Sequence, residues 1–196
     1  MEARGAVENL GRFAAQLADA KAVGRNFLPW AKENRTRMEQ LFGYAQGQGM
    51  PAIYSLVKPF EHPELPLVGL NYSPVAHNTL HRFPSGWTTP LRLCRGIIFD
   101  TAGRLMAKPF PKFFNYGEHP ETEAVPDLPF EATRKHDGHL GIIFEHRGKL
   151  LVTTRGSFRS KTSVLAQKML DGYARKFSWR KNFPKDITLL VEVIDP

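Results

Sequence analysis

Two apolar runs separated by a short polar turn constrain the fold most. HLGIIFE (139–145) and LLVTTRG (150–156) flank HRGK, and this length, composition and turn predict an antiparallel hairpin. LRLCRGIIFD (91–100) and LMAKPF (105–110) flank TAGR in the same way and predict a second hairpin. TLLVEVI (188–194) adds another strand. We therefore expect antiparallel sheets.

Helical periodicity dominates the start of the chain, where residues 3–47 are expected to be helical. The apolar positions of its two stripes are Leu10, Phe13, Leu17 and Ala20, then Met38, Leu41, Phe42 and Ala45. The cluster GQGMP is expected to end the second helix. One later helix is predicted from a spacing of four between apolar residues, with Ser163 as its N-cap. Its stripe is Leu165, Met169, Tyr173 and Phe177.

These elements predict an α+β fold in two parts. The first is an N-terminal helical segment, residues 1–47, and the second is a domain over residues 48–196. Residues 51–90 are expected to be loops with short strands, ordered in part by Trp87 and Phe83. Because an antiparallel strand needs a partner and the sequence stops just after 188–194, we expect a C-terminally truncated domain.

The charge balance favours a polyanionic partner. The net charge is +8, from 27 Lys and Arg against 19 Asp and Glu. Between Arg155 and Lys185 the only acidic residue is Asp171, so this stretch is either a solvated basic face or one that follows a nucleic-acid backbone. A lone cysteine, Cys94, suits a reducing compartment, and no apolar run has the length of a membrane span. We expect a soluble, cytoplasmic protein.

Lys135-His136-Asp137-Gly138 is the strongest candidate for chemistry, because it precedes an apolar strand. Lysine is a nucleophile only when its amine is deprotonated, which requires a lowered pKa. Gly138 would let a ligand approach the backbone, and Asp137 would fix the lysine or contact the ligand. The alternative is a solvated turn lysine.

Charged residues also occur on apolar strand faces. Alternation places Arg95 with Leu93, Ile97 and Phe99. Glu192 likewise shares a face with Leu190 and Ile194. An inward charge is costly unless it is paired or faces a ligand, so the choice lies between an Arg95–Glu192 ion pair and a binding site.

Two further segments combine cations with ligand-binding residue types. KPFPKFFNYGE (108–118) places Lys108 and Lys112 among aromatic rings, which suits phosphates and stacked bases or, alternatively, a core strand with snorkelling lysines. TTRGSFRSK (153–161) forms a strand-to-helix turn whose backbone donors suit phosphate.

Taken in order, these segments resemble the covalent nucleotidyltransferase superfamily, and more closely the phage-type RNA ligase 1 family. KHDG corresponds to the nucleotidyl motif I, TRGS to the next conserved turn and LLVEVIDP to motif IIIa, while CRGIIFD and KPFPKFFNYGE narrow the match to the family. The resemblance runs from about Met38 to Pro196. It implies a nucleotidyltransferase domain, the ATP-grasp-like adenylation domain of ligases.

The resemblance implies an ATP-dependent RNA ligase that uses ATP and Mg²⁺ and takes part in RNA repair. Lys135 would form lysyl-AMP, and AMP would then pass to an RNA 5′-phosphate that a 3′-hydroxyl attacks. Nucleotide-binding roles would fall to Arg95, Lys112, Phe114, Asp137, Gly138, Arg155 and Glu192. Neighbouring cations would lower the pKa of Lys135. No metal ligand is assigned.

The sequence departs from the family at three places. His139 stands where serine is usual and Val193 where an aromatic residue is common. The strands of motifs IV and V do not follow, so weak or absent self-adenylylation is expected. Alternatives are a DNA ligase or capping-type guanylyltransferase, a non-catalytic RNA-binding remnant, and a purely structural role for the charged residues.

Overall fold

The computed structural model describes residues 2–124, 127–178, 183–184 and 186–194. Its helices are α1 (Glu2–Ala22), α2 (Phe27–Glu33), α3 (Arg35–Phe42), α4 (Ile53–Leu56), α5 (Pro74–Thr79), α6 (Thr89–Leu93) and α7 (Lys161–Lys176), with the 3₁₀ turns η1 (Leu80–Arg82) and η2 (Pro120–Thr122). Its strands are β1 (Val57–Glu61), β2 (Leu67–Tyr72), β3 (Arg95–Asp100), β4 (Leu105–Ala107), β5 (His139–His146), β6 (Lys149–Thr154) and β7 (Leu189–Val193).

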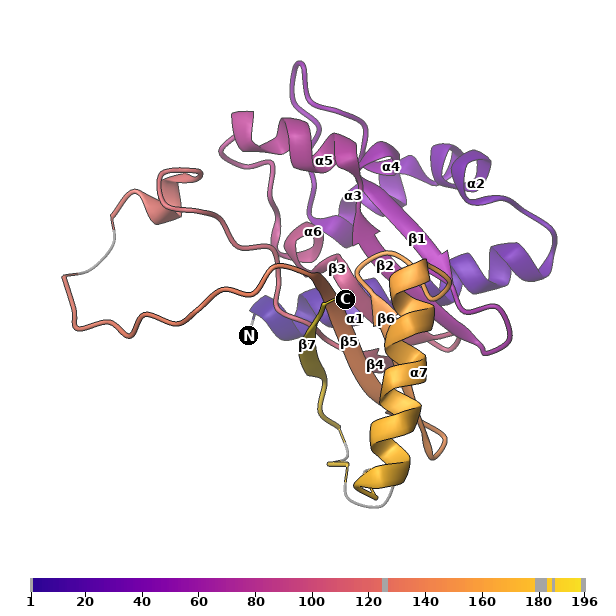
Figure 1. The fold of residues 1–196 in the computed structure, drawn as a ribbon. Coiled ribbons are helices and arrows are strands. Elements are labelled where there is room, and N and C mark those ends of the chain that lie inside the picture. Colours follow the sequence, from indigo (N-terminus) through magenta and orange to yellow (C-terminus); the bar gives the residue numbers. More distant parts are fainter. Residues whose placement is uncertain (1, 125–126, 179–182, 185, 195–196) are drawn as a thin grey trace.

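Two antiparallel sheets pack face to face between helices. The first sheet has the order β1-β2-β3-β4 and the second the order β6-β5-β7. Helices α1 to α6 bury an apolar cluster against the outer face of the first sheet, and α7 packs on the outer face of the second (Figure 1). A third cluster fills the space between the sheets. The α+β class expected from the sequence is confirmed.

Strand β3 shows why the sequences of some strands are continuous apolar runs without alternating polar residues. Ile97 and Phe99 point into the helical cluster, whereas Ile98 points into the cluster between the sheets. A strand with both faces covered has no solvent side on which polar residues would alternate.

The N-terminal helices pack onto the first sheet through their predicted stripe. Leu10, Phe13 and Leu17 are buried, and the Phe13 ring meets the Phe42 ring edge-on at 5.0 Å. A Cβ on Gly11 would lie 2.3 Å from the carbonyl oxygen of Gly103, so α1 requires glycine there to approach the β3–β4 turn. The helical segment therefore shares one core with the sheet.

Two predicted boundaries were wrong. Helix α3 ends at Phe42, because Gly43 takes the left-handed conformation with φ of 57°, and Ala45 lies exposed beyond the helix. Leu91 to Leu93 belong to helix α6 rather than to the following strand, since the Thr88 hydroxyl accepts a hydrogen bond from the Leu91 N–H and Pro90 lies in the first turn.

The predicted face of helix α7 was also wrong. Ser160, not Ser163, caps the helix, and its side chain accepts a hydrogen bond from the Ser163 N–H. The buried positions are Ser163, Ala166, Leu170 and Ala174. Met169, Tyr173 and Phe177 are 43%, 49% and 49% exposed. The helix rests on its small residues, because these let it lie close to the second sheet.

In the described part of the chain, no helix is both long enough and apolar enough to cross a membrane.

Candidate nucleotide and RNA site

The two sheets bring most of the predicted site residues to one end. His139 at the start of β5 pairs with Val193 of β7, and Gly141 pairs with Thr154 at the end of β6. In the first sheet, Arg95 at the start of β3 pairs with Asn71 of β2. The sheets meet at this end, since a Cβ on Gly96 would lie 2.5 Å from Ile142 Cδ1 and 3.1 Å from Arg155 Cα.

Lys135 lies in the long segment between β4 and β5, which extends away from both sheets before it returns to β5 (Figure 1). Its side chain is 83% exposed and its Nζ donates a hydrogen bond to the Asp137 carboxylate. That hydrogen bond and the charge of Asp137 raise the pKa of Lys135, and the more distant Glu192 acts in the same direction. The expected lowering of the Lys135 pKa was therefore wrong.

Gly138 fixes how the Lys135 segment joins the second sheet. A Cβ there would lie 2.4 Å from the Val193 carbonyl oxygen and 3.1 Å from Glu192 Cγ. No other residue permits this approach without moving strand β7. The glycine therefore places Lys135 and Asp137 beside Glu192.

Glu192 faces the same side of strand β7 as Leu190, whose side chain packs between the sheets. Leu190 is partly buried, but Glu192 lies nearer the strand end and is exposed. Among the described residues no ion pair joins Glu192 to Arg95. The carboxylate is available to a ligand at this end of the sheet.

Arg155 follows strand β6 and is held by Tyr72. Its Nη1 donates a hydrogen bond of 2.9 Å to the Tyr72 hydroxyl, and its guanidinium carbon lies 5.1 Å from the centre of the Tyr72 ring. Tyr72 is itself 5% exposed and meets the Trp87 ring edge-on. A buried aromatic residue therefore orients an exposed cation.

Arg95 lies close to this arginine in the fold, but alternation did not predict its surroundings. Gly96 has φ of 93°, and the pairing of β2 with β3 shifts at the same place. The alternation of side chains between the two faces of β3 therefore does not extend across Gly96 to Arg95. The Arg95 guanidinium lies over the Phe113 ring, 4.9 Å from its centre.

Lys112 and Phe114 lie deeper than a simple binding-site interpretation predicts. They are 7% and 8% exposed. Lys112 Nζ donates to the Phe113 carbonyl oxygen at 2.8 Å, pairs with Glu118 and lies 4.2 Å from the centre of the Phe114 ring. Phe114 also stacks on His119 with ring centres 4.2 Å apart. These contacts hold the segment after β4 against the helical cluster.

The first turn of α7 holds the turn that follows β6 through hydrogen bonds. The Ser163 hydroxyl donates a hydrogen bond of 2.6 Å to the Ser157 carbonyl, and the Thr154 N–H donates to the same oxygen. The turn is thereby ordered next to Arg155. Within the predicted basic face, Arg180, Lys181 and Lys185 lie outside the described residues, as do Asp195 and Pro196 of the last motif.

The carboxylates at this end of the sheets would hold a metal ion only together with the phosphates of a bound nucleotide. Within the ranges that the structure describes, no three His, Cys, Asp or Glu side chains are grouped to hold a metal. Asp137 and Glu192 offer exposed carboxylates near Lys135. Mg²⁺ is commonly held by one or two carboxylates together with substrate phosphates, which matches this set.

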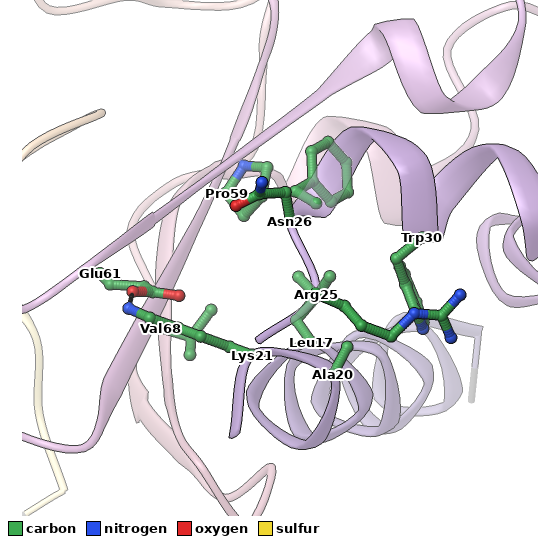
Figure 2. A pocket seen from close by; sticks show the side chains of 10 residues that line it. Leu17, Ala20, Lys21, Arg25, Asn26, Trp30, Pro59, Glu61 and Val68 are labelled. Carbon is green, nitrogen blue, oxygen red and sulfur yellow. Dashed lines mark hydrogen bonds and ion pairs between the residues drawn. The ribbon is translucent and has the colours of Figure 1, made fainter. Parts of the chain in front are cut away.

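Sequence reasoning missed Tyr72, Gly96 and a pocket on the far side of the first sheet. The pocket, of about 260 Å³, lies between α1, α2 and strand β1, and Trp30 and Arg25 line it (Figure 2). Lys21 and Glu61 form an ion pair at its edge. No sequence signal marks these features, because each depends on which elements meet.

Comparisons with known proteins identify relatives of this chain. A family model described as RNA ligase matches residues 93–196. A curated protein of Thermovibrio ammonificans named "Putative RNA ligase" is 32% identical over 121 residues. The match covers 58% of this chain and 31% of that protein, so the chain spans about a third of the length of this relative.

Proposed function

Because the chain belongs to the phage-type RNA ligase family, we propose that it acts in ATP-dependent joining of RNA 5′-phosphate ends to 3′-hydroxyl ends, within a nucleotidyltransferase fold. The observation that carries the proposal is the gathering of Lys135, Glu192 and Arg155 at one end of two packed sheets. These are the residue types that a nucleotidyl-transfer site needs.

Lys135 is the proposed nucleophile. Its neutral Nζ attacks the α-phosphorus of ATP, the P–N bond forms, and the bond to pyrophosphate breaks. The AMP is then transferred from Nζ to an RNA 5′-phosphate. In the last step the RNA 3′-hydroxyl attacks that phosphate, forms the phosphodiester and releases AMP. Each step replaces one phosphoryl bond by another, so no oxidant or reductant is needed.

The surrounding residues have separate proposed roles. Arg155 and Arg95 neutralise phosphate charge, since phosphoryl transfer depends mainly on positioning and electrostatics. Glu192 accepts hydrogen bonds from the ribose. Lys112 and Phe114 are proposed to contribute to the nucleotide site, as the family resemblance implies. Bound Mg²⁺ would neutralise charge on the transferring phosphoryl group, with Asp137 and Glu192 as the nearest carboxylates.

The proton on Lys135 has to leave before attack. Asp137 stabilises the ammonium form of Lys135. A metal ion bound together with the nucleotide would neutralise the Asp137 carboxylate, and its charge and that of the nearby arginines would lower the pKa of Lys135, which frees the amine. Asp137 thus holds the lysine in place until nucleotide binds.

A joining assay tests the proposal. The chain is incubated with ATP, Mg²⁺ and two single-stranded RNAs, one with a 5′-phosphate and one with a free 3′-hydroxyl. We expect a joined product that depends on the 5′-phosphate and on ATP. Covalent labelling of Lys135 by GTP in place of ATP would instead indicate a capping-type guanylyltransferase, and joining of DNA ends alone would indicate a DNA ligase. No product under any condition would contradict the proposal.

A second candidate is a non-catalytic RNA-binding protein of the same family. The exposed position of Lys135 and its ion pair with Asp137, which raises the pKa of Lys135, also suit a lysine without a catalytic role. RNA binding that survives Lys135→Ala, without any covalent nucleotide, would support this candidate.

A further inference from the structure

The segment after β4 divides its side chains between core and solvent. Pro109, Lys112 and Phe114 are buried. Phe110, Phe113 and Tyr116, here called the outer rings, are 68%, 60% and 76% exposed. One short segment therefore keeps three large aromatic side chains in water.

The segment is anchored, so the outer rings do not belong to a loose loop. The Lys112 N–H donates a hydrogen bond of 2.7 Å to the Arg92 carbonyl, and the Phe114 ring packs in the helical cluster. Glu118 accepts a hydrogen bond of 2.8 Å from the Asn115 N–H. With its inner residues fixed in this way, the chain has to present Phe110 and Phe113 outward.

Cations accompany the outer rings. Arg95 lies over Phe113, and its Nη1 is 3.5 Å from the Phe110 carbonyl oxygen. Lys108 is exposed two residues before Phe110. Next to Arg95 in the chain, a Cβ on Gly96 would lie 3.1 Å from Arg155 Cα, so Phe110 and Phe113 adjoin the end of the sheets where Lys135 lies.

From this arrangement, which rests on the proposed function, we propose that the outer rings form a stacking surface for bases of the single-stranded RNA that is to be joined. Aromatic faces bind any base by stacking, and neighbouring cations bind the phosphates between bases. Protein interfaces also use aromatic rings and arginine, but these rings adjoin the site that is proposed to join RNA ends. The pairing of rings with Arg95 and Lys108 favours RNA.

Fluorescence anisotropy of a labelled single-stranded RNA tests the surface in the absence of ATP. A 5′-phosphorylated RNA of about 12 nucleotides is long enough for a stacking module. We expect Phe113→Ala and Phe110→Ala each to weaken binding by about fivefold or more. Phe130→Ala is the matched control, because Phe130 is 90% exposed in the same long segment but outside the anchored part.

The outcomes separate this surface from the proposed function. Binding that is lost with the outer rings but not with Phe130, at unchanged thermal stability, confirms the surface even if the chain forms no lysyl-AMP. Equal binding by all variants, equal loss with Phe130→Ala, or no RNA binding by the unsubstituted chain overturns it. In each of those cases lysyl-AMP formation, measured in parallel without RNA, still decides the proposed function.

Discussion

Lys135 and Asp137 form an exposed ion pair in the segment that leads into β5, and in the proposed mechanism this pair sets how much of the amine is neutral. A raised pKa means that less of the amine is neutral at a given pH. The labelling rate should therefore increase with pH until Lys135 has titrated.

Asp137→Asn should lower the pKa of Lys135, because it removes the negative charge that raises this pKa and leaves a weaker, uncharged hydrogen-bond acceptor. Carbon-13 NMR of reductively methylated lysines, assigned with Lys135→Arg, measures this titration directly. Glu131→Gln removes another exposed carboxylate of the same segment and should leave the Lys135 titration unchanged. An unchanged or higher Lys135 pKa in Asp137→Asn would contradict the account.

Tyr72→Phe should raise the KM for ATP in self-adenylylation by about three- to tenfold, because Arg155 loses its hydrogen bond but keeps the ring beneath it. The kcat should change little. Tyr44→Phe is the matched control, since the Tyr44 hydroxyl also donates a hydrogen bond, to the Pro51 carbonyl, and does not contact Arg155. If both substitutions change KM alike, Tyr72 has no specific role in placing Arg155.

At the scale of elements, the contact between the two sheets depends on Gly96. Its φ of 93° disfavours any side chain, and a Cβ would meet Ile142 and the Arg155 backbone. We expect Gly96→Ala to lower the free energy of unfolding by about 3 kcal/mol. Chemical denaturation measures this change.

Gly172→Ala provides the control for that measurement. Gly172 lies in helix α7, and a Cβ added there would meet no neighbouring atom within 4 Å, so alanine should stabilise the protein by about 1 kcal/mol. A small effect of Gly96→Ala, comparable in size to that of Gly172→Ala, would show that the sheets do not meet at Gly96.

Helix α7 gives the second prediction at this scale. Leu170 is 4% exposed against the second sheet, whereas Met169 is 43% exposed. We expect Leu170→Ala to cost about 3 kcal/mol of unfolding free energy and Met169→Ala less than about 1 kcal/mol. If Met169→Ala lowered the free energy of unfolding more than Leu170→Ala does, the buried face of α7 would be the one that the sequence pattern predicted.

Sequence patterns predicted where the helices and strands of this protein lie better than they predicted which face of each is buried. The hairpin of β5 and β6 was predicted because both its strands and its turn have local signals. The face of α7 was not, because Ala166 and Ala174 are small and a stripe of larger residues gives the stronger apolar signal. Burial there depends on close approach to a sheet, which no local pattern contains.

At the scale of the whole molecule, two packed sheets place residues from distant parts of the sequence at one end. The chain order of KHDG, TRGS and the last strand suggested a shared site, and the structure brings their strands together by pairing β6 and β7 on either side of β5. The ion pair of Lys135 with Asp137 is local and was among the sequence expectations, whereas Tyr72 beneath Arg155 could not be predicted, since that contact joins residues 83 positions apart.

The central claim is that Lys135 carries AMP. The most direct measurement is to incubate the chain with α-labelled ATP and Mg²⁺, denature it, and map the labelled peptide by mass spectrometry, with Lys149→Ala as a matched exposed-lysine control. We predict label on Lys135 that is acid-labile, as a phosphoramidate is, absent from Lys135→Ala and retained in Lys149→Ala. Label on another residue, or label that survives Lys135→Ala, would contradict the account.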